Sequence, residues 1–222
     1  IRDWSVTGVQ TCALPIFQTF IDDAPEELSK AKFSASQERS LGIGVMGFHS
    51  YLQSKNIPFA SAMGKSVNMR MGRHIKAGCD AATEKLAYEK GPCPDAAKYG
   101  VMRRNANVTA IAPTATVAII CGTVSPSMEP WTANAFTQKT LSGSFLVKNK
   151  YLEILLEEKG INTQEVWSSI LTNEGSVQHL EALTDDEKYV YLTAFETDQR
   201  WILEHAATRQ QFVDQMISTN LF

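Results

Sequence analysis

The residues from 109 to 131, TAIAPTATVAIICGTVSPSMEPW, are those whose types and order best suit ligand chemistry. An apolar stretch ends at Pro113, which fixes its own φ and favours a sharp turn after it. Thr114, Ala115 and Thr116 are small enough for backbone N–H groups to approach a ligand, and the two hydroxyls add donors. The apolar VAII that follows predicts a short helix whose N-terminus carries partial positive charge. The stretch is therefore compatible with a phosphate-binding turn.

The same residues also fit a purely structural role. No lysine lies within the loop, so it lacks the residue with which a Walker loop reaches the phosphates. A threonine that caps a helix after a core strand explains the pattern without a ligand, and the chemistry alone favours that alternative.

A second motif, GIGVMG at residues 42–47, has the spacing G-x-G-x-x-G of dinucleotide-binding turns. Such a site needs a buried strand before the glycines and an acid about 20 residues after them. The preceding FSASQERS is too polar for a central strand, and no Asp or Glu occurs between Arg39 and Cys79. We therefore expect these glycines to allow close packing of a barrel strand against its helix.

Composition narrows the class of protein. The chain has 222 residues, of which 44% are hydrophobic, enough for a globular core, and its net charge of −3 gives no reason to expect nucleic-acid binding. No apolar run approaches the roughly 18 residues that span a membrane. The four cysteines and four histidines show no metal-ligand spacing: Cys12, Cys79, Cys93, Cys121, His49, His74, His179 and His205. Because the cysteines also lie far apart, they indicate a reduced, cytoplasmic chain.

Charge is distributed unevenly along the chain. From Arg39 to Cys79 inclusive, six Lys or Arg occur without an acid, whereas Glu153 to Glu204 contains twelve acids and three bases. Solvated helix faces explain both regions. The alternative is that the basic half faces an anionic ligand or an acidic neighbour.

The order of elements predicts an α/β fold with parallel strand pairing. We expect a long helix that ends at Gly91, a buried strand within residues 103–113, and an extended pair that turns at Gly143. A further helix is expected to stop at Gly160.

Two S/T/N-x-x-E patterns predict helix starts. Asn162 with Glu165 resembles one capping box, and Thr184 with Glu187 resembles another. The second is expected to open a long helix with Tyr191, Phe195 and Ile202 on one face.

The N-terminal residues differ from the rest. RDWSVTGVQTCALPI, residues 2–16, has no strand or helix periodicity and resembles the translated read-through of a sequencing adapter. We interpret residues 1–16 as lying outside the fold, expect one domain over 17–222, and expect the chain to be a fragment of a longer protein.

Four motifs in this order resemble the large (catalytic) subunit of class I ribonucleotide reductase: RSLGIGVMGFHSYLQ, RNANVTAIAPTATVAIICGTVSPSMEPW, KTLSGSFLVKN and SSILTNEGSVQHL. The resemblance covers residues 17–222. Class II, cobalamin-dependent relatives tend to have glycine where Ala115 stands, so Ala115 and the KTLSGSF run favour class I.

The resemblance implies a helix-rich, C-terminal part of a ten-stranded α/β barrel built from two parallel halves. It also implies that the substrate's diphosphate binds to Pro113, Thr114, Ala115, Thr116 and Val117. The family's radical cysteine with its Asn and Glu partners, its redox cysteines, its radical-transfer tyrosines and its effector sites would all lie outside this chain. No catalytic residue, metal ligand or bound cofactor is therefore expected within it.

The parent enzyme would reduce ribonucleoside diphosphates to deoxyribonucleoside diphosphates by radical chemistry, for DNA synthesis. The resemblance implies a large-subunit homodimer, a small subunit whose metal generates the radical, thioredoxin or glutaredoxin as dithiol reductant, and ATP or dNTP effectors. The isolated fragment is expected to be inactive.

The sequence leaves the roles of several other residues, and two alternative functions, undecided. Cys79, Cys93 and Cys121 are expected to be packing residues, and Glu129 either supports the loop from below or stabilises a turn. One rival function is a non-catalytic nucleotide-binding module that uses the same loop. The other is a helical interaction domain in which PTATVAII is only a core strand and a turn.

Overall fold

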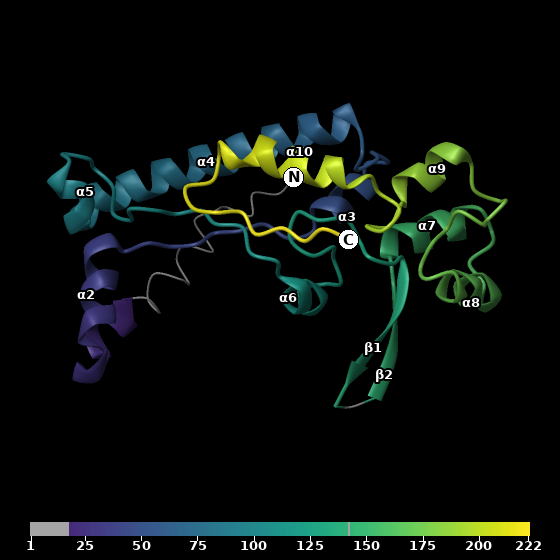
Figure 1. The fold of residues 1–222 in the computed structure, drawn as a ribbon, viewed down its shortest axis with the longest axis horizontal. Coiled ribbons are helices and arrows are strands. Elements are labelled where there is room, and N and C mark those ends of the chain that lie inside the picture. Colours follow the sequence, from purple (N-terminus) through teal and green to yellow (C-terminus); the bar gives the residue numbers. More distant parts are fainter. Residues whose placement is uncertain (1–17, 142) are drawn as a thin grey trace. The chain divides into compact units, whose positions relative to one another are not determined.

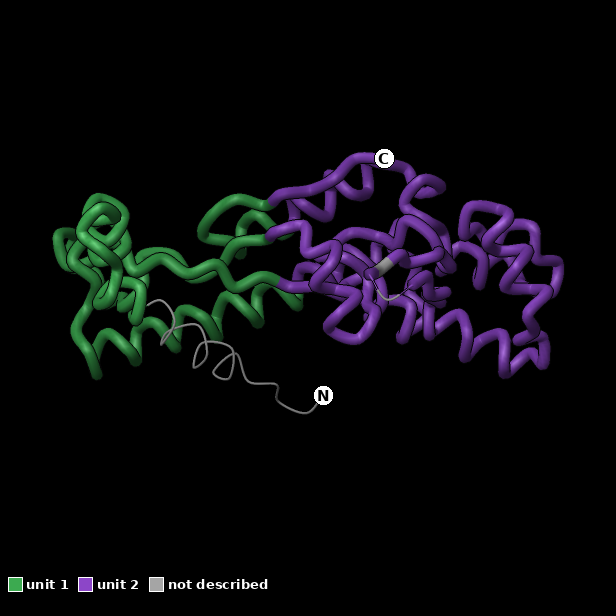
Figure 2. Tube along the Cα trace, turned by 90° about the horizontal axis from the view of Figure 1, so that it is seen from below, with its two compact units in different colours: residues 1–44, 70–111, 209–217 green, residues 45–69, 112–208, 218–222 purple. Residues whose placement is uncertain are grey.

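The computed structural model describes residues 18–141 and 143–222, which form two compact units (Figure 2). Among described residues, unit 1 contains 18–44, 70–111 and 209–217, and unit 2 contains 45–69, 112–208 and 218–222. The proposed boundary at residue 17 and the adapter-like stretch lie outside the described residues, and so does Cys12.

Unit 1 combines helices with three extended segments (Figure 1). Residues 18–23 are helical, and the further helical elements are η1 (Glu26–Leu28), α2 (Ser29–Glu38), the C-terminal part of α4 (Ala62–Lys90) and α5 (Pro94–Lys98). The expected long helix is thus confirmed as α4, and Gly91 follows it with φ +79°, a left-handed conformation that glycine adopts without strain.

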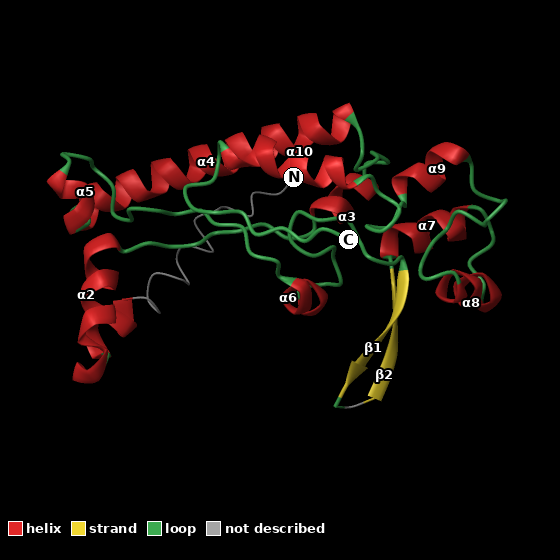
Figure 3. Cartoon of the chain, in the orientation of Figure 1, coloured by secondary structure: helices red, strands yellow, loops and turns green. Residues whose placement is uncertain are grey.

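The extended segments of unit 1 pair in parallel, as the sequence predicts, but only at isolated bridges. Ile43 pairs with Thr109, and Ile111 pairs with Ile217. The central segment, residues 107–111, therefore lies between residues 41–44 and 215–217. Figure 3 draws all three as loops, because no continuous ladder forms among them in the described part of the chain.

Side chains explain why the ladder is short. The N–H of Val108 donates to Oδ2 of Asp214 at 2.8 Å, and the N–H of Asp214 donates to Oγ1 of Thr109 at 2.8 Å. Backbone donors that would extend a sheet are thus bonded to side chains. The expected strand over 103–113 is correct in direction and pairing but wrong as a continuous strand.

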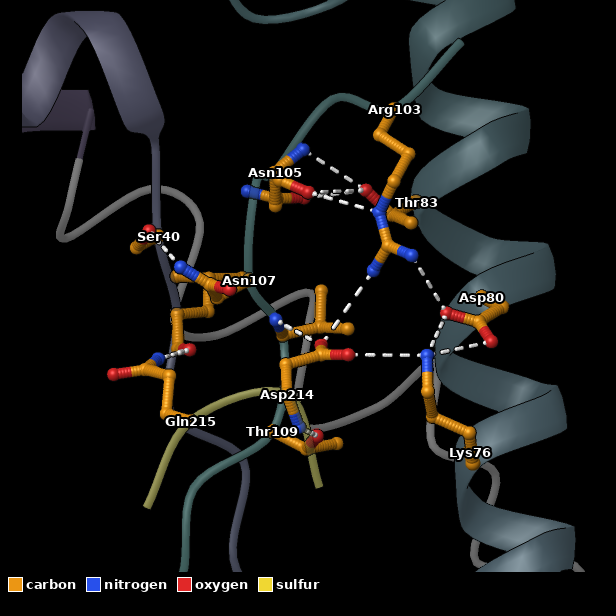
Figure 4. A network of polar contacts seen from close by, with 12 residues as sticks. Ser40, Lys76, Asp80, Thr83, Arg103, Asn105, Asn107, Thr109, Asp214 and Gln215 are labelled. Atoms are coloured by element: carbon orange, nitrogen blue, oxygen red, sulfur yellow. Dashed lines mark hydrogen bonds and ion pairs between the residues drawn. The ribbon is translucent and has the colours of Figure 1, made fainter. Parts of the chain in front are cut away.

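Asp214 is also the centre of an ion network (Figure 4). Its carboxylate lies 3.0 Å from Nζ of Lys76 and 3.5 Å from a guanidinium nitrogen of Arg103, and both cations also contact Asp80. Burial raises the pKa of Asp214, but the bonds from Val108 and Lys76 and the two positive charges hold that pKa below its usual value. The network fastens the start of the third segment to α4.

The glycines of the GIGVMG motif permit close approach between these segments. A Cβ on Gly44 would lie 2.8 Å from the carbonyl oxygen of Ala110, and one on Gly42 would lie 3.3 Å from the Ala110 Cβ. Close packing is therefore the role of these two glycines, but the neighbour is the central extended segment and not a helix.

Unit 2 contains the remaining helices and one hairpin. Its elements are α3 (Phe48–Gln53), the start of α4, α6 (Ala115–Ile120), β1 (Ala135–Thr140), β2 (Gly143–Lys148), α7 (Lys150–Glu158), α8 (Gln164–Thr172), α9 (Asp185–Val190) and most of α10 (Gln199–Gln210). β1 and β2 pair antiparallel, with Ala135 opposite Lys148 and Thr140 opposite Gly143, so the predicted extended pair is confirmed. The helix expected to stop at Gly160 is α7, and Gly160 has φ +71°.

The core of unit 2 lies between the hairpin base and α7, α8 and α9. Its buried members are Ala135, Leu152, Leu156, Trp167, Ile170, Val177, Leu183, Val190 and Tyr191. Burial of this apolar area, at roughly 25 cal/mol per Å², is the main force that holds these short helices together.

One predicted capping box is confirmed and the other is wrong. Thr184 and Glu187 bond each other's backbone N–H groups at the start of α9. α8, in contrast, is capped by Thr163, because Oδ1 of Asn162 accepts from the indole N–H of Trp167 at 2.6 Å. A buried indole requires a hydrogen-bond acceptor, and this requirement determines where the Asn162 side chain points.

The expected long helix after Thr184 is also wrong. α9 ends at Val190, and α10 begins at Gln199. Between them the N–H of Ala194 donates to the carbonyl of Trp131 at 2.7 Å, and the N–H of Thr193 donates to the Glu196 carboxylate at 2.8 Å. Phe195 is consequently 70% exposed, whereas Tyr191 and Ile202 are buried.

Candidate functional site: the loop at residues 113–117

The loop at 113–117 begins α6, as its sequence predicts. α6 runs from Ala115 to Ile120, and the first bond into it goes from the N–H of Ala118 to the carbonyl of Thr114 at 2.9 Å. The N–H groups of Ala115, Thr116 and Val117 precede that bond, and they have no acceptor among residues 18–141 and 143–222. Three consecutive backbone donors are thus available to a ligand.

These donors lie at the surface of unit 2. Pro113, Ala115, Thr116 and Val117 are exposed, Thr114 is half-buried, and α6 is anchored by Ala118, which is 1% exposed. An oxyanion can therefore reach the first turn of α6 without displacing a core residue.

Thr114 does not cap α6 with its side chain. The alternative role expected from the sequence, a threonine that caps the helix after a core strand, is therefore wrong. Thr114 occupies the N-cap position with φ +46° and ψ +28°, a left-handed conformation that a β-branched residue rarely adopts. Its Oγ1 instead accepts from the backbone N–H of Ser127 at 2.8 Å. The hydroxyl proton of Thr114 remains available to donate.

Ser127 shares this unusual backbone. Its φ is +44°, its side chain is 1% exposed, and its Oγ has no hydrogen-bond partner within the part of the chain that the structure describes. Thr123 between them also has positive φ, at +53°. Strained non-glycine residues concentrate at functional sites, where neighbouring structure holds them in place.

A buried acid supports the same region. The Glu129 carboxylate is 2% exposed and accepts from the N–H of Asn220 at 2.7 Å and from its Nδ2 at 2.9 Å. Glu129 therefore connects the turn after α6 to residues 218–222. Of the two expected roles, support of the loop region fits better than stabilisation of a local turn.

A pocket of about 210 Å³ adjoins the loop. Pro113, Ala115, Glu129, Trp131 and Asn220 contribute to its wall, together with Ile119, Val124, Pro126, Thr132, Phe136 and Phe222. The interaction-domain rival required that the loop's N–H groups be consumed internally and that no pocket open beside them. Neither condition is met.

The cysteines divide into two kinds. Cys79 and Cys93 are fully buried, as expected for packing residues, and Cys93 is the residue before the first turn of α5. Cys121 is exposed, so its expected packing role is wrong. Cys121 directly follows α6, whose exposed end does not pack against the core.

His49 is buried in a network of hydrogen bonds. Its Nδ1 accepts from the N–H of Trp131 at 3.0 Å, and its Nε2 lies 3.4 Å from the carbonyl of Val190. Burial lowers the pKa of His49 to about 4, against a smaller raising effect of the Val190 carbonyl. No group of three or more potential metal ligands occurs among the described residues.

Extended segments pair in parallel in this chain and lead into helix N-termini, and this arrangement defines the protein as α/β. A candidate anion-binding loop lies at the carboxyl end of the central segment. The sequence model of the ribonucleotide reductase barrel domain matches residues 5–101 and 95–222. The chain belongs to this family, and the expected fold class, a helix-rich part of the ribonucleotide reductase barrel, is confirmed.

Known relatives agree with this family. The chain is 47% identical to the ribonucleoside-diphosphate reductase large subunit of Invertebrate iridescent virus 6, over 91% of this chain and 21% of that protein. It is 44% identical to a putative large subunit of Frog virus 3 (isolate Goorha), over 99% of this chain and 40% of that protein. Among solved structures, the alpha subunit of the Actinobacillus ureae class Id ribonucleotide reductase matches with a TM-score of 0.84 and 39% identity, over 93% of this chain and 38% of that one. The chain thus spans well under half the length of these relatives.

Sequence reasoning found the loop but missed the residues that hold it. Nothing in the sequence distinguishes Ser127 or Asn220, because both act on segments that are distant along the chain. The one sequence signal for a supporting residue was Glu129, because it is an acid within an apolar stretch.

Proposed function

We propose that this chain supplies the substrate-diphosphate loop of a ribonucleoside-diphosphate reductase large subunit. The observation that carries the proposal is the row of three N–H groups, of Ala115, Thr116 and Val117, without acceptors in the described structure. Family membership supports it, since the relatives that cover most of this chain carry that enzyme's name.

In this proposal each loop residue has a defined task. Pro113 ends the extended segment and directs the chain into the turn. The N–H groups of Ala115, Thr116 and Val117 donate to the diphosphate oxygens, and the α6 N-terminus adds a favourable dipole. The hydroxyls of Thr114 and Thr116 donate further bonds, that of Thr114 from an orientation fixed by Ser127.

The loop's contribution to catalysis is positional. A diphosphate held at two or more oxygens restricts the ribose to one place, and such positioning can lower a barrier by several kcal/mol. The radical chemistry at the 2′-OH belongs, in this proposal, to residues of the large subunit outside this chain. Partner subunits, dithiol reductant, nucleotide effectors and a cytoplasmic location are part of the same proposal, from family membership.

The test is to add charge at the loop of a full-length large subunit that carries this segment. Ala115→Glu places a carboxylate at the proposed diphosphate position, and we expect the KM for cytidine diphosphate to rise at least about tenfold through charge repulsion. Ile120→Glu is the matched control, since Ile120 is 79% exposed at the other end of α6. Equal KM values for the two variants would contradict the loop assignment.

The rival, a non-catalytic nucleotide-binding module, is separated by product analysis. If the full-length protein with its small subunit and a dithiol binds cytidine diphosphate but forms no deoxycytidine diphosphate, the rival is correct.

No helix among the described residues is long and apolar enough to cross a membrane.

A further inference from the structure

The pocket beside the loop at 113–117 has a mainly apolar wall without a positive charge. Trp131, Phe136 and Phe222 are the aromatic residues of this wall, and Glu129 adds a carboxylate. No Lys or Arg occurs among the described residues that line it. A phosphate gains nothing from such a wall, whereas an uncharged ring system buries apolar surface against it. The pocket is therefore suited to the uncharged part of a ligand whose anionic part lies at the loop.

A chain of hydrogen bonds joins two of these wall residues, Trp131 and Phe222. The backbone N–H of Ala194 donates to the carbonyl of Trp131 at 2.7 Å, and the carbonyl of Ala194 accepts from Nε2 of Gln199 at 2.9 Å. Oε1 of Gln199 then accepts from the backbone N–H of Phe222 at 2.9 Å. We call these four residues the brace. It connects the turn after α6 to the segment 218–222 through the start of α10.

The direction of the Gln199 amide is fixed by its neighbours. Nε2 donates a second bond, to the carbonyl of Thr197 at 2.8 Å, so the nitrogen faces two carbonyl oxygens and Oε1 faces the N–H of Phe222. Reversing the amide would place like groups against each other at all three contacts. Donating twice and accepting once requires a primary amide at position 199.

The brace begins at a rigid residue. Trp131 is 4% exposed, its indole N–H donates to Oγ of Ser50 at 3.0 Å, and its backbone N–H donates to Nδ1 of His49 at 3.0 Å. At the other end, the ring of Phe222 meets the ring of Phe195 edge to face, with 5.5 Å between centroids. Because Trp131 is fixed, the brace determines where Phe222 lies in the pocket wall.

We propose that Gln199 is a positioning residue of the substrate site. Through the brace it holds Phe222 as a wall against the nucleoside part of the substrate. Gln199 does not line the pocket itself, so it acts through Phe222. The inference rests on the proposed function of the loop, because a diphosphate bound at Ala115 leaves the nucleoside beside the pocket that Ala115 also lines.

The test compares two probes on a full-length large subunit that carries this segment, assayed with its small subunit and a dithiol. Cytidine diphosphate requires the loop and the pocket, whereas inorganic pyrophosphate, as a competitive inhibitor, requires the loop alone. Gln199→Met removes the amide from a side chain of similar length. We expect the KM for cytidine diphosphate to rise about fivefold, since a directional contact of the wall is lost. We expect kcat and the Ki of pyrophosphate to stay within about twofold of wild type, because the wall contributes uniform binding to the nucleoside.

Gln210→Met is the matched control, at the other end of α10. Nε2 of Gln210 donates to the carbonyls of Val213 and Gln215, at 3.4 Å and 2.9 Å, and Gln210 does not line the pocket. This variant loses comparable bonds and should keep the wild-type KM. Phe222→Ala removes the ring from the wall directly. It should raise the KM and leave pyrophosphate inhibition unchanged, whether or not Gln199→Met folds.

Three results would overturn the inference. The first is an unchanged KM in folded Gln199→Met or, if that variant does not fold, in Phe222→Ala. The second is an equal rise in KM for Gln210→Met, which would assign the effect to general stability. The third is weaker inhibition by pyrophosphate in Gln199→Met, which would show that Gln199 acts on the loop and not on the pocket wall.

Ala115→Glu separates these failures from failure of the loop assignment. It should weaken both probes, because both place phosphate oxygens at the loop. If it weakens neither, the proposed function fails and this inference fails with it. If it weakens both while Gln199→Met changes neither, the loop assignment stands and only the role of Gln199 is wrong.

Discussion

The backbone N–H of Ser127 donates to Oγ1 of Thr114 at 2.8 Å, and both residues have positive φ. This bond joins the two ends of the turn that contains α6. It removes the Thr114 hydroxyl from helix capping and fixes its direction at the entrance of the helix. The geometry of the candidate diphosphate loop therefore depends on a residue thirteen positions later in the chain.

Thr114→Val tests this bond. Valine has the shape of threonine without the acceptor, so the N–H of Ser127 loses its partner, at a cost of about 1–2 kcal/mol in the free energy of unfolding. Thr114→Ser retains the acceptor and is the control, which should unfold near the wild-type urea midpoint. In a full-length large subunit, Thr114→Val should raise the KM for a ribonucleoside diphosphate more than Thr114→Ser does. A lower unfolding midpoint for the serine variant than for the valine variant would contradict this role.

Gly175→Ala tests close packing at the base of the hairpin. Gly175 has φ +82°, and an added Cβ would overlap the Cβ of Ala133 and lie 2.9 Å from the backbone nitrogen of Asn134. We expect a loss of at least about 3 kcal/mol, since the backbone itself must move.

Gly160→Ala is the matched control for this substitution. Gly160 has φ +71°, but among the described residues nothing beyond its chain neighbours lies within 4 Å of where an alanine Cβ would stand. Only the conformational cost of about 1 kcal/mol therefore applies. Equal urea midpoints for the two variants would show that contact with Ala133 does not matter.

His49 predicts a loss of stability in mild acid. Its pKa is about 4 in the folded chain, against a usual value of 6.5, so the unfolded state binds a proton first as the pH falls. The contribution of neutral His49 to the free energy of unfolding is fully present above pH 6.5. It is lost between about pH 6.5 and pH 4, to a total of about 3 kcal/mol. His49→Gln, which does not titrate, should show a smaller fall in urea midpoint over that interval. Parallel pH curves for the two proteins would exclude His49 as the cause.

Asp214→Asn tests the ion network of unit 1. The amide cannot balance Lys76 and Arg103, and we expect a loss of about 2–3 kcal/mol because Asp214 is only 12% exposed. Glu204→Gln breaks the solvent-exposed pair with Lys65, where 52% of the glutamate side chain is exposed, and it should cost under about 1 kcal/mol.

The acid response of Asp214 provides a second measurement. Its pKa is below the usual value in the folded chain, so its stabilisation is present above the unfolded pKa and is lost as the pH falls through the folded one. The difference in unfolding free energy between wild type and Asp214→Asn should therefore shrink in acid. A constant difference would show that packing and not charge is responsible.

Local sequence signals were sufficient where one segment determines its own structure. Gly91 and Gly160 end their helices, Thr184 and Glu187 form a capping box, and the second strand of the hairpin begins at Gly143, because each depends on residues within a few positions. The same reasoning failed at Asn162, whose oxygen is bound by the indole of Trp167. It failed again after Val190, where the carbonyl of Trp131 takes the N–H of Ala194.

The sequence by itself determined the family, the helices with local stop signals and the position of the loop at 113–117, because motifs and caps are encoded in adjacent residues. Only the tertiary structure decided how that loop is held. The left-handed Thr114, its bond from Ser127 and the bond from Asn220 to Glu129 join residues distant in sequence. Such contacts form only when folding brings buried polar groups together and each must find a partner.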